Sequence, residues 1–319
     1  MKAAFFGSES QIDYVYANGR REKVAGTCKL YPEIINNDNF DAHLDALKEV
    51  EVIFSTWGML NLTERQLDCM PSLKAVFYAA GATDGFARPL LARGITLMSA
   101  WQANAIPVAE FAAAQIVLAL KGFFWNSREL KCKAKWDRDN TGPGVFEESV
   151  ALIGAGAIAL KTKELLKNHN VDVFIVPSRK EKRTVSLEEA FRTAFVVSNH
   201  LPNRHDNIGV INGEHFRSMR RGAAFVNTGR GAQVNETEMI EVLKERPDLT
   251  VLLDVTHPEP PEDDSELYKL PNVHLSAHIA GSMNKEVIRM ADYAIEEFER
   301  WRSGEPLLYQ ISEDMLMTN

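Results

Sequence analysis

The stretch SVALIGAGAIALKTKELL, residues 149–166, joins an apolar run to a helical pattern through a turn of small residues. Within it Gly154, Gly156 and Ala159 stand in the spacing G-x-G-x-x-A. The first glycine permits a tight turn, the second lets backbone approach a pyrophosphate, and the third small residue lets helix and strand pack closely. Because a helix N-terminus offers free N–H groups, the stretch predicts a dinucleotide-binding turn, with a purely structural turn as the alternative. The candidate cofactor contacts here are Gly154, Ala155, Gly156, Ala157 and Ile158.

The alternation of apolar runs and helical patterns continues on both sides of this turn. Runs that predict buried strands occupy residues 2–6, 51–56, 74–80, 149–154, 171–176, 194–199, 223–228, 250–255 and 273–277. Helical spacing occupies residues 39–50, 62–70, 187–192, 212–219, 236–246 and 286–304. Strands that alternate with helices are typical of parallel sheets, so the sequence predicts an α/β fold.

A further helix is predicted over residues 106–125, IPVAEFAAAQIVLALKGFFW. Pro107 suits a first helical turn, and from Phe111 to Leu120 the only polar side chain is Gln115. A helix that is apolar on nearly all sides must be buried on nearly all sides. We therefore expect it to pack between domains or against a second copy of the chain, and not to span a membrane.

Bulk composition restricts the class of protein. The chain has 319 residues, enough for two domains, with 45% hydrophobic and 25% charged residues. A net charge of −8 without a dense basic run argues against nucleic-acid or anionic-membrane partners. The N-terminus has too short an apolar stretch for a signal peptide. Three widely spaced cysteines predict reduced thiols, a cytoplasmic location and no metal site.

Three charged residues in the second half suit one chemistry. Arg230, Glu259 and His278 each follow a predicted strand, and ligands of open α/β sheets bind beyond the carboxyl ends of strands. Reduction of a 2-keto acid needs a cation for the carboxylate, which an arginine fork provides, and a proton for the carbonyl oxygen, which a histidine provides. A nearby glutamate orients that histidine. The alternatives are that Arg230 lies in a surface turn and His278 in the core.

Glu259 lies between Pro258 and Pro260. Prolines fix φ and lack an N–H group, so neither a helix nor a strand ladder forms easily there. A polar turn at the end of a strand is the simpler interpretation. Together with His278, however, the two prolines predict a rigid carboxylate directed at the histidine.

The end of the second strand after the glycine turn bears on cofactor choice. NAD enzymes of this architecture usually carry an acid there, which binds the ribose hydroxyls and repels a 2′-phosphate. Here the position falls on Pro177, followed by Ser178, Arg179 and Lys180. A hydroxyl and cations suit a 2′-phosphate, so we expect NADP(H) to be preferred, with Arg179 as the main contact and NAD(H) as the second choice. A solvated basic loop is the alternative.

At this point the residues resemble those of a known family. VNTGRG (226–231), DVTHPEP (254–260) and AHIAGS (277–282) look like the three signature blocks of the D-2-hydroxyacid dehydrogenases, in that family's order. Earlier segments, YAAGATDGF (78–86) and RGITLMSAWQANAIPVAE (93–110), also match, so the resemblance covers nearly the whole chain. Ala277 departs from the family's usual proline and Asn207 from its common threonine.

The resemblance implies roles for individual residues. It makes Arg230 the substrate-orienting arginine, Glu259 the partner acid and His278 the acid/base. It places Thr228 and Asp254 at the nicotinamide carboxamide, and Pro202 and Asn207 along the cofactor. For the substrate it implies backbone N–H groups of Ala80, Gly81 and Ala82, a hinge at Asn104, and a pocket near Trp57, which otherwise fills the core.

The resemblance also implies an architecture and an activity. We expect two similar doubly wound parallel-sheet domains, with a Rossmann nucleotide-binding domain (103–284) inserted into a flavodoxin-like substrate domain (1–102), which residues 285–319 rejoin. The expected activity interconverts a small 2-keto acid and its D-2-hydroxy acid, as in glyoxylate/hydroxypyruvate reductases, in a homodimer built on helix 106–125. The rival hypothesis is a dinucleotide sensor or corepressor-like protein on the same scaffold.

Overall fold

The computed structural model describes residues 1–136 and 139–317. Contacts divide the chain into unit 1, formed by Met1–Asn104 and the chain from Ser282 onward, and unit 2, Ala105–Gly281. The sequence placed these divisions at 102/103 and 284/285. Residues 137–138 of the predicted nucleotide-binding domain and 318–319 of the predicted tail lie outside the described residues.

Unit 1 is built on sheet A, in which every pairing is parallel and the strand order is β2-β1-β3-β4-β5. Its strands are β1 (Lys2–Phe6), β2 (Lys29–Leu30), β3 (Val52–Ser55), β4 (Ala75–Tyr78) and β5 (Thr96–Ser99). Its helices are α1 (Glu9–Val15), α2 (Arg20–Thr27), α3 (Leu44–Leu47), α4 (Glu64–Asp68), α5 (Ala87–Ala92), α12 (Val287–Ser303) and α13 (Glu313–Met317), with 3-10 turns η1 (Phe40–His43) and η7 (Asn284–Glu286).

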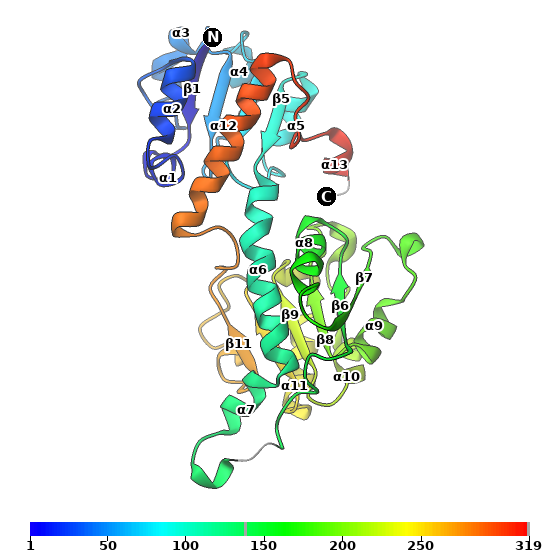
Figure 1. Cartoon of the computed structure of the whole chain (residues 1–319). Coiled ribbons are helices and arrows are strands. Elements are labelled where there is room, and N and C mark those ends of the chain that lie inside the picture. The colour runs from blue at the N-terminus through cyan, green and yellow to red at the C-terminus, as the bar shows by residue number, and fades with distance from the viewer. Residues whose placement is uncertain (137–138, 318–319) are drawn as a thin grey trace. The chain divides into compact units, whose positions relative to one another are not determined.

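The last long helix, α12, completes the core of unit 1. It packs on β4 and β5, far from it in sequence, as Figure 1 shows. The ring of Phe298 lies 5.1 Å from that of Phe54 and 5.4 Å from that of Phe77, both edge-on. Such aromatic contacts add to the burial of apolar area, so the chain's return is fixed by packing. Gly304 ends the helix at φ 74°, as its pattern predicts.

Unit 2 is built on sheet B, also parallel throughout, with the strand order β11-β10-β9-β8-β6-β7. Its strands are β6 (Glu148–Ile153), β7 (Val171–Val176), β8 (Val196–Asn199), β9 (Ala224–Asn227), β10 (Thr250–Leu253) and β11 (Val273–Leu275). Its helices are α7 (Phe123–Glu129), α8 (Ala157–Leu166), α9 (Leu187–Thr193), α10 (Gly213–Ser218) and α11 (Glu236–Glu245), with 3-10 turns η2 (Lys133–Lys135), η3 (Lys180–Lys182), η4 (His205–Asn207), η5 (Gly231–Gln233) and η6 (Glu266–Tyr268). Strand order reverses between β6 and β8, where doubly wound sheets bind ligands. The predicted pair of doubly wound α/β domains is confirmed.

Helix α6 (Trp101–Leu120) starts earlier than the sequence predicts. Pro107 lies inside it and not in its first turn, so the expected start at residue 106 is wrong. The helix contains the boundary between the two units, at residues 104/105. Among the described residues it is the one helix long and apolar enough to cross a membrane, a test that the buried core helix of a soluble protein also passes.

Candidate active site

The glycine turn after β6 is open at the positions where a pyrophosphate would approach. Gly154 has φ 110°, and a Cβ there would lie 2.3 Å from the His200 carbonyl oxygen, so no other residue fits. A Cβ on Gly156 would meet nothing within 4 Å. Within the described chain, no acceptor is paired with the N–H groups of residues 155–158, which lead into α8. These donors and this space fit a dinucleotide pyrophosphate.

The segment after β7 presents a hydroxyl and two cations. The Ser178 Oγ atom is buried and has no hydrogen-bond partner, while Arg179 and Lys180 are exposed. Arg183, which the sequence did not single out, donates to the carbonyls of Pro177 (2.8 Å) and Ser178 (2.9 Å) and holds this segment. The sequence could not single out Arg183, because the run SRKEKR (178–183) contains four cationic residues and nothing in it shows which one binds these carbonyls.

The segments after β8 and β9 form the next part of this edge. Thr228 is buried, with Oγ1 3.4 Å from His200 Nδ1, and His200 Nε2 lies 2.9 Å from Ser198 Oγ. Burial lowers the pKa of His200 to about 4, so its imidazole is neutral near pH 7. Asn207 is buried and donates to the Pro202 carbonyl at 2.9 Å, which fixes the fold of that loop.

Glu259 and His278 face each other across a short hydrogen bond. Glu259 Oε1 lies 2.6 Å from His278 Nδ1, and the side chains are 40% and 51% exposed. The peptide bonds before Pro258 and Pro260 are both cis. The pairing leaves Nε2 of His278 as the ring nitrogen available to a substrate, as acid/base chemistry requires.

Asp254 holds the His278 loop in shape. It is 4% exposed and accepts hydrogen bonds from Ser276 Oγ (2.6 Å), Ile279 N–H (2.8 Å) and Ala280 N–H (2.9 Å). His278 itself has φ 53°, a left-handed conformation that non-glycine residues adopt seldom, and its N–H donates to the Asp254 carbonyl. Two donors use Oδ1 and one uses Oδ2, so Oδ2 can accept a further donor.

Arg230 lies on a turn between two closely packed glycines, of which Gly231 leaves no room for a side chain. A Cβ on Gly231 would lie 2.0 Å from the Thr256 carbonyl group, and one on Gly229 would lie 2.8 Å from Gln233 Oε1. The half-buried arginine donates from Nη1 to the Gly229 carbonyl at 2.8 Å. Arg230, Glu259 and His278 follow β9, β10 and β11, which are adjacent strands, so the three side chains arise from one edge of sheet B.

The predicted substrate residues of unit 1 surround the loop after β4. Ser99 Oγ lies 2.8 Å from the Ala80 carbonyl oxygen and 2.6 Å from that of Gly81. The N–H groups of Ala80, Gly81 and Ala82 have no acceptor in the described chain, and successive free N–H groups suit a carboxylate. Ser99 was not predicted as a residue of this site, although a polar residue at the carboxyl end of a strand could have indicated it.

Two other unit 1 residues have defined settings. Asn104 Oδ1 accepts from Ser282 N–H at 2.9 Å, at the two points where the chain passes from one unit to the other. Trp57 is partly buried and packs against the hydrophobic core of unit 1. Its ring therefore contributes to the core, which was one of the two expectations for it.

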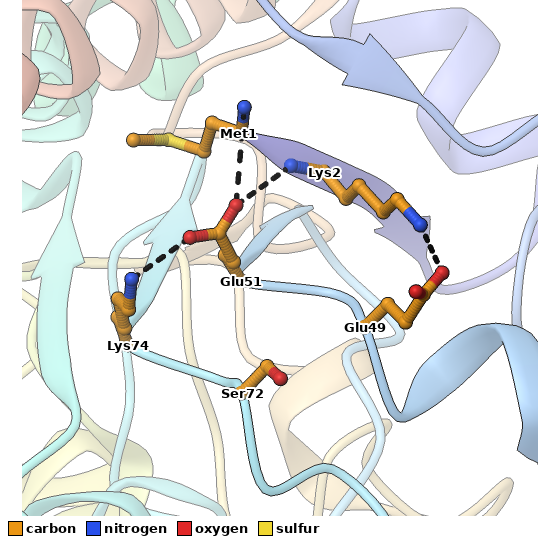
Figure 2. A pocket seen from close by; sticks show the side chains of 6 residues that line it. All are labelled: Met1, Lys2, Glu49, Glu51, Ser72 and Lys74. Carbon is orange, nitrogen blue, oxygen red and sulfur yellow. Dashed lines mark hydrogen bonds and ion pairs between the residues drawn. The ribbon is translucent and has the colours of Figure 1, made fainter.

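A hollow of about 440 Å³ in unit 1 does not compete with this edge as a ligand site. It is lined by Met1, Lys2, Glu49, Glu51, Ser72 and Lys74. Figure 2 shows its charges paired with one another: Lys74 Nζ donates to Glu51 at 2.8 Å, and Lys2 pairs with Glu49. It lies at the amino ends of β1, β3 and β4, opposite the edge where parallel sheets bind ligands. Among the described residues no group of His, Cys, Asp and Glu forms a metal site.

Comparison with known proteins assigns the family. The model of the family described as "D-isomer specific 2-hydroxyacid dehydrogenase, NAD binding domain" matches residues 113–280, more than half of the chain. The chain belongs to the D-isomer specific 2-hydroxyacid dehydrogenases. Residues 113–280 are thus the NAD-binding domain of such a dehydrogenase, and the predicted resemblance is confirmed.

Individual relatives of this dehydrogenase agree with the family. The chain is 30% identical over 241 residues to YoaD of Bacillus subtilis (strain 168), whose name places it among the 2-hydroxyacid dehydrogenases; the match covers 71% of this chain and 70% of YoaD. It is 27% identical over 254 residues to the glyoxylate reductase of Thermofilum pendens (strain DSM 2475 / Hrk 5), covering 75% of each. The D-mandelate dehydrogenase of Rhodotorula graminis has the same fold, with a TM-score of 0.81 at 19% identity over 98% of this chain and 97% of that one.

Proposed function

We propose that this dehydrogenase reduces a small 2-keto acid to its D-2-hydroxy acid with a nicotinamide cofactor. The observation that carries the proposal is the 2.6 Å bond between Glu259 and His278, at the same sheet edge as Arg230 and the open glycine turn. An acid/base, its orienting carboxylate and a cation are the groups that this reaction requires.

Each residue of the site has a separate role in the proposed reaction. When bound, the nicotinamide supplies a hydride to the carbonyl carbon of the substrate. Arg230 binds the carboxylate and the carbonyl oxygen of the substrate. His278, protonated, gives the proton on Nε2 to the carbonyl oxygen, while its Nδ1–H donates to Glu259 throughout. In the reverse direction neutral His278 takes that proton from the hydroxyl group.

The cofactor is held by the carboxyl edge of sheet B. The open N–H groups of residues 155–158 receive the pyrophosphate, and Thr228, Pro202 and Asn207 line the loops that follow β8 and β9. Asp254 Oδ2, which accepts one bond, can take an N–H of the nicotinamide carboxamide.

We propose that NADPH is preferred over NADH. Ser178 Oγ is a buried hydroxyl in need of a partner, Arg179 and Lys180 supply positive charge, and no acid stands at the end of β7 to repel a phosphate. A 2′-phosphate would satisfy the hydroxyl and pair with both cations. Arg183 contributes by holding the carbonyls of Pro177 and Ser178 in place.

We further propose a cytoplasmic homodimer that pairs through α6 and the helix after it. Two large apolar side chains on these helices are exposed: Leu118 of α6 is 40% exposed and Phe123 of α7 is 51% exposed. Burying such side chains against a second copy removes apolar surface from water.

The test is a substrate panel. Glyoxylate, hydroxypyruvate and pyruvate are each assayed with NADPH and NADH, and the chirality of the product is determined for hydroxypyruvate and pyruvate, because the glycolate formed from glyoxylate is achiral. We expect turnover of at least one keto acid, a D-configured product and higher kcat/KM with NADPH. Tight cofactor binding without turnover of any 2-keto acid would instead favour the sensor or corepressor hypothesis.

A further inference from the structure

Three buried side-chain amides lie together at the carboxyl edge of sheet B. Asn199 ends β8, Asn227 ends β9, and Gln233 closes the turn η5. They are 0%, 1% and 2% exposed. Asn199 Nδ2 donates to Asn227 Oδ1 at 2.9 Å and to Gln233 Oε1 at 2.7 Å. We refer to these three residues as the amide cluster.

The amide cluster binds both backbone polar groups of Arg230. The Arg230 N–H donates to Gln233 Oε1 at 3.2 Å, and the Arg230 carbonyl accepts from Asn227 Nδ2 at 3.3 Å. The N–H of Gly229 donates to Asn227 Oδ1 at 3.1 Å. Because the peptide groups on both sides of Arg230 are held, the direction in which its side chain leaves the backbone is set by buried amides.

The same cluster binds the loop after β8. Gln233 Nε2 donates to the carbonyls of Leu201 (3.0 Å) and Pro202 (2.8 Å), and the Leu201 N–H donates to Asn199 Oδ1 at 3.2 Å. Gln233 thus accepts two hydrogen bonds and donates two, which is the full capacity of an amide. One side chain therefore joins the backbone of Arg230 to the Leu201–Pro202 loop.

We infer that Gln233 is a positioning residue, which fixes Arg230 relative to the loop along which the cofactor lies. This inference rests on the proposed function, because it gives Arg230 a substrate to orient. It differs from a role in stability alone: if Gln233 acts through Arg230, its contribution to turnover disappears when the guanidinium is absent.

A double-mutant cycle measures that dependence. Gln233→Met has similar volume but leaves Arg230 N–H, Leu201 and Pro202 without their partners. In the wild-type background it should lower kcat/KM for the keto acid about 10²-fold, the effect of a misplaced contact. In the Arg230→Ala background, with the cofactor at a saturating concentration in both backgrounds, it should lower kcat/KM for the keto acid no more than about twofold, since the group that it positions is gone. Equal factors in the two backgrounds would overturn the inference.

Asn272→Leu is the matched control. Asn272 is 1% exposed and donates to the Leu243 and Arg246 carbonyls at 3.0 and 3.2 Å, but it lies at the amino end of β11. It should lower the melting temperature and leave kcat/KM within about twofold of wild type. A fall in kcat/KM as large as that of Gln233→Met would mean that any lost buried amide impairs turnover, and the inference would fail.

Amide hydrogen exchange tests the role of Gln233 without an activity assay. Gln233→Met should raise amide exchange in both segments 199–203 and 228–233, and Asn272→Leu in neither. Unchanged protection in either segment would show that Gln233 does not join Arg230 to the Leu201–Pro202 loop, whether or not the enzyme reduces a keto acid. Absence of turnover with every keto acid would refute the proposed function and would leave this exchange test in force. If the methionine variant does not fold, Gln233→Glu replaces it. Because this variant keeps the acceptor for Arg230 and loses the donors to Leu201 and Pro202, amide exchange should rise in segment 199–203, and unchanged protection there would overturn the inference.

Discussion

The carboxylate of Asp254 should control both the stability of unit 2 and the position of His278. It is buried and accepts hydrogen bonds from Ser276, Ile279 and Ala280, which surround the histidine in sequence. The substitution Asp254→Asn keeps the shape of the side chain and replaces one acceptor oxygen with a donor. If the remaining oxygen keeps Ser276 and Ile279, the new NH₂ group faces the N–H of Ala280, donor against donor.

The size of the effect follows from these contacts. A hydrogen bond to a charged group contributes about 1.5–3 kcal/mol and a neutral one about 1 kcal/mol. The variant loses one charge-assisted bond and weakens two, so the free energy of unfolding should fall by about 2–4 kcal/mol. Released from its anchor, His278 can leave its left-handed conformation, and a shift of the imidazole by about 1 Å costs about 10²-fold in kcat.

Urea unfolding followed by circular dichroism measures the first quantity and steady-state kinetics the second. Asp248→Asn is the control, because Asp248 also binds a backbone N–H, that of Gly222 at 3.0 Å, before β9 and away from the site. Ser276→Ala removes one donor to Asp254 without changing the carboxylate, so it should lower stability and kcat less but in the same direction. If Ser276→Ala leaves kcat unchanged while Asp254→Asn abolishes it, the loss comes only from the contact proposed between Asp254 and the nicotinamide carboxamide, and the anchoring argument is wrong.

Three further predictions concern pH, cofactor and assembly. Because burial lowers the pKa of His200 to about 4, the unfolded chain binds a proton that the folded chain does not between about pH 6.5 and 4, so stability falls as pH drops. Wild type should lose about 3 kcal/mol more than His200→Gln between pH 7 and pH 4 in urea unfolding, and parallel losses would contradict a buried neutral His200. Arg179→Ala should raise the KM for NADPH far more than that for NADH; equal or better wild-type efficiency with NADH would refute the proposed preference. Leu118→Glu should convert a dimer to monomers in light scattering, because Leu118 is exposed on α6 and a charge there opposes burial against a second copy. A monomeric wild type at micromolar concentration would refute the dimer.

Much of the fold is readable from the sequence because the strands are buried on both faces. The run AAFVNT predicts β9, and SVALIG predicts β6 with the glycine turn that follows. Two strands were missed, β2 because it has only two residues and β5 because its run TLMS is short and partly polar. The start of α6 was misplaced because Pro107 is normal in a first turn, whereas here tertiary packing carries the helix through it.

The candidate site was predictable only where chemistry and strand ends coincide. Arg230, Glu259 and His278 stand out as charged groups after apolar runs, and the structure pairs the latter two. The left-handed φ of His278 and the bonds of Asp254 to residues 276–280 depend on contacts across more than twenty positions. Gln233 gave no signal for a similar reason: it lies in η5, and its partners in the amide cluster lie at the ends of β8 and β9, up to 34 positions away.

The most direct test of the central claim is the turnover of His278→Asn. Asparagine tolerates the left-handed backbone of this position better than most residues, so the loop should keep its fold while the acid/base group is removed. With glyoxylate or the best keto acid of the panel, kcat should fall by about 10²–10⁴-fold, the usual contribution of a positioned acid/base, while the dissociation constant of the reduced cofactor changes little. Turnover near that of the wild type would show that His278 does not donate the proton, and the mechanism proposed for this dehydrogenase would be wrong.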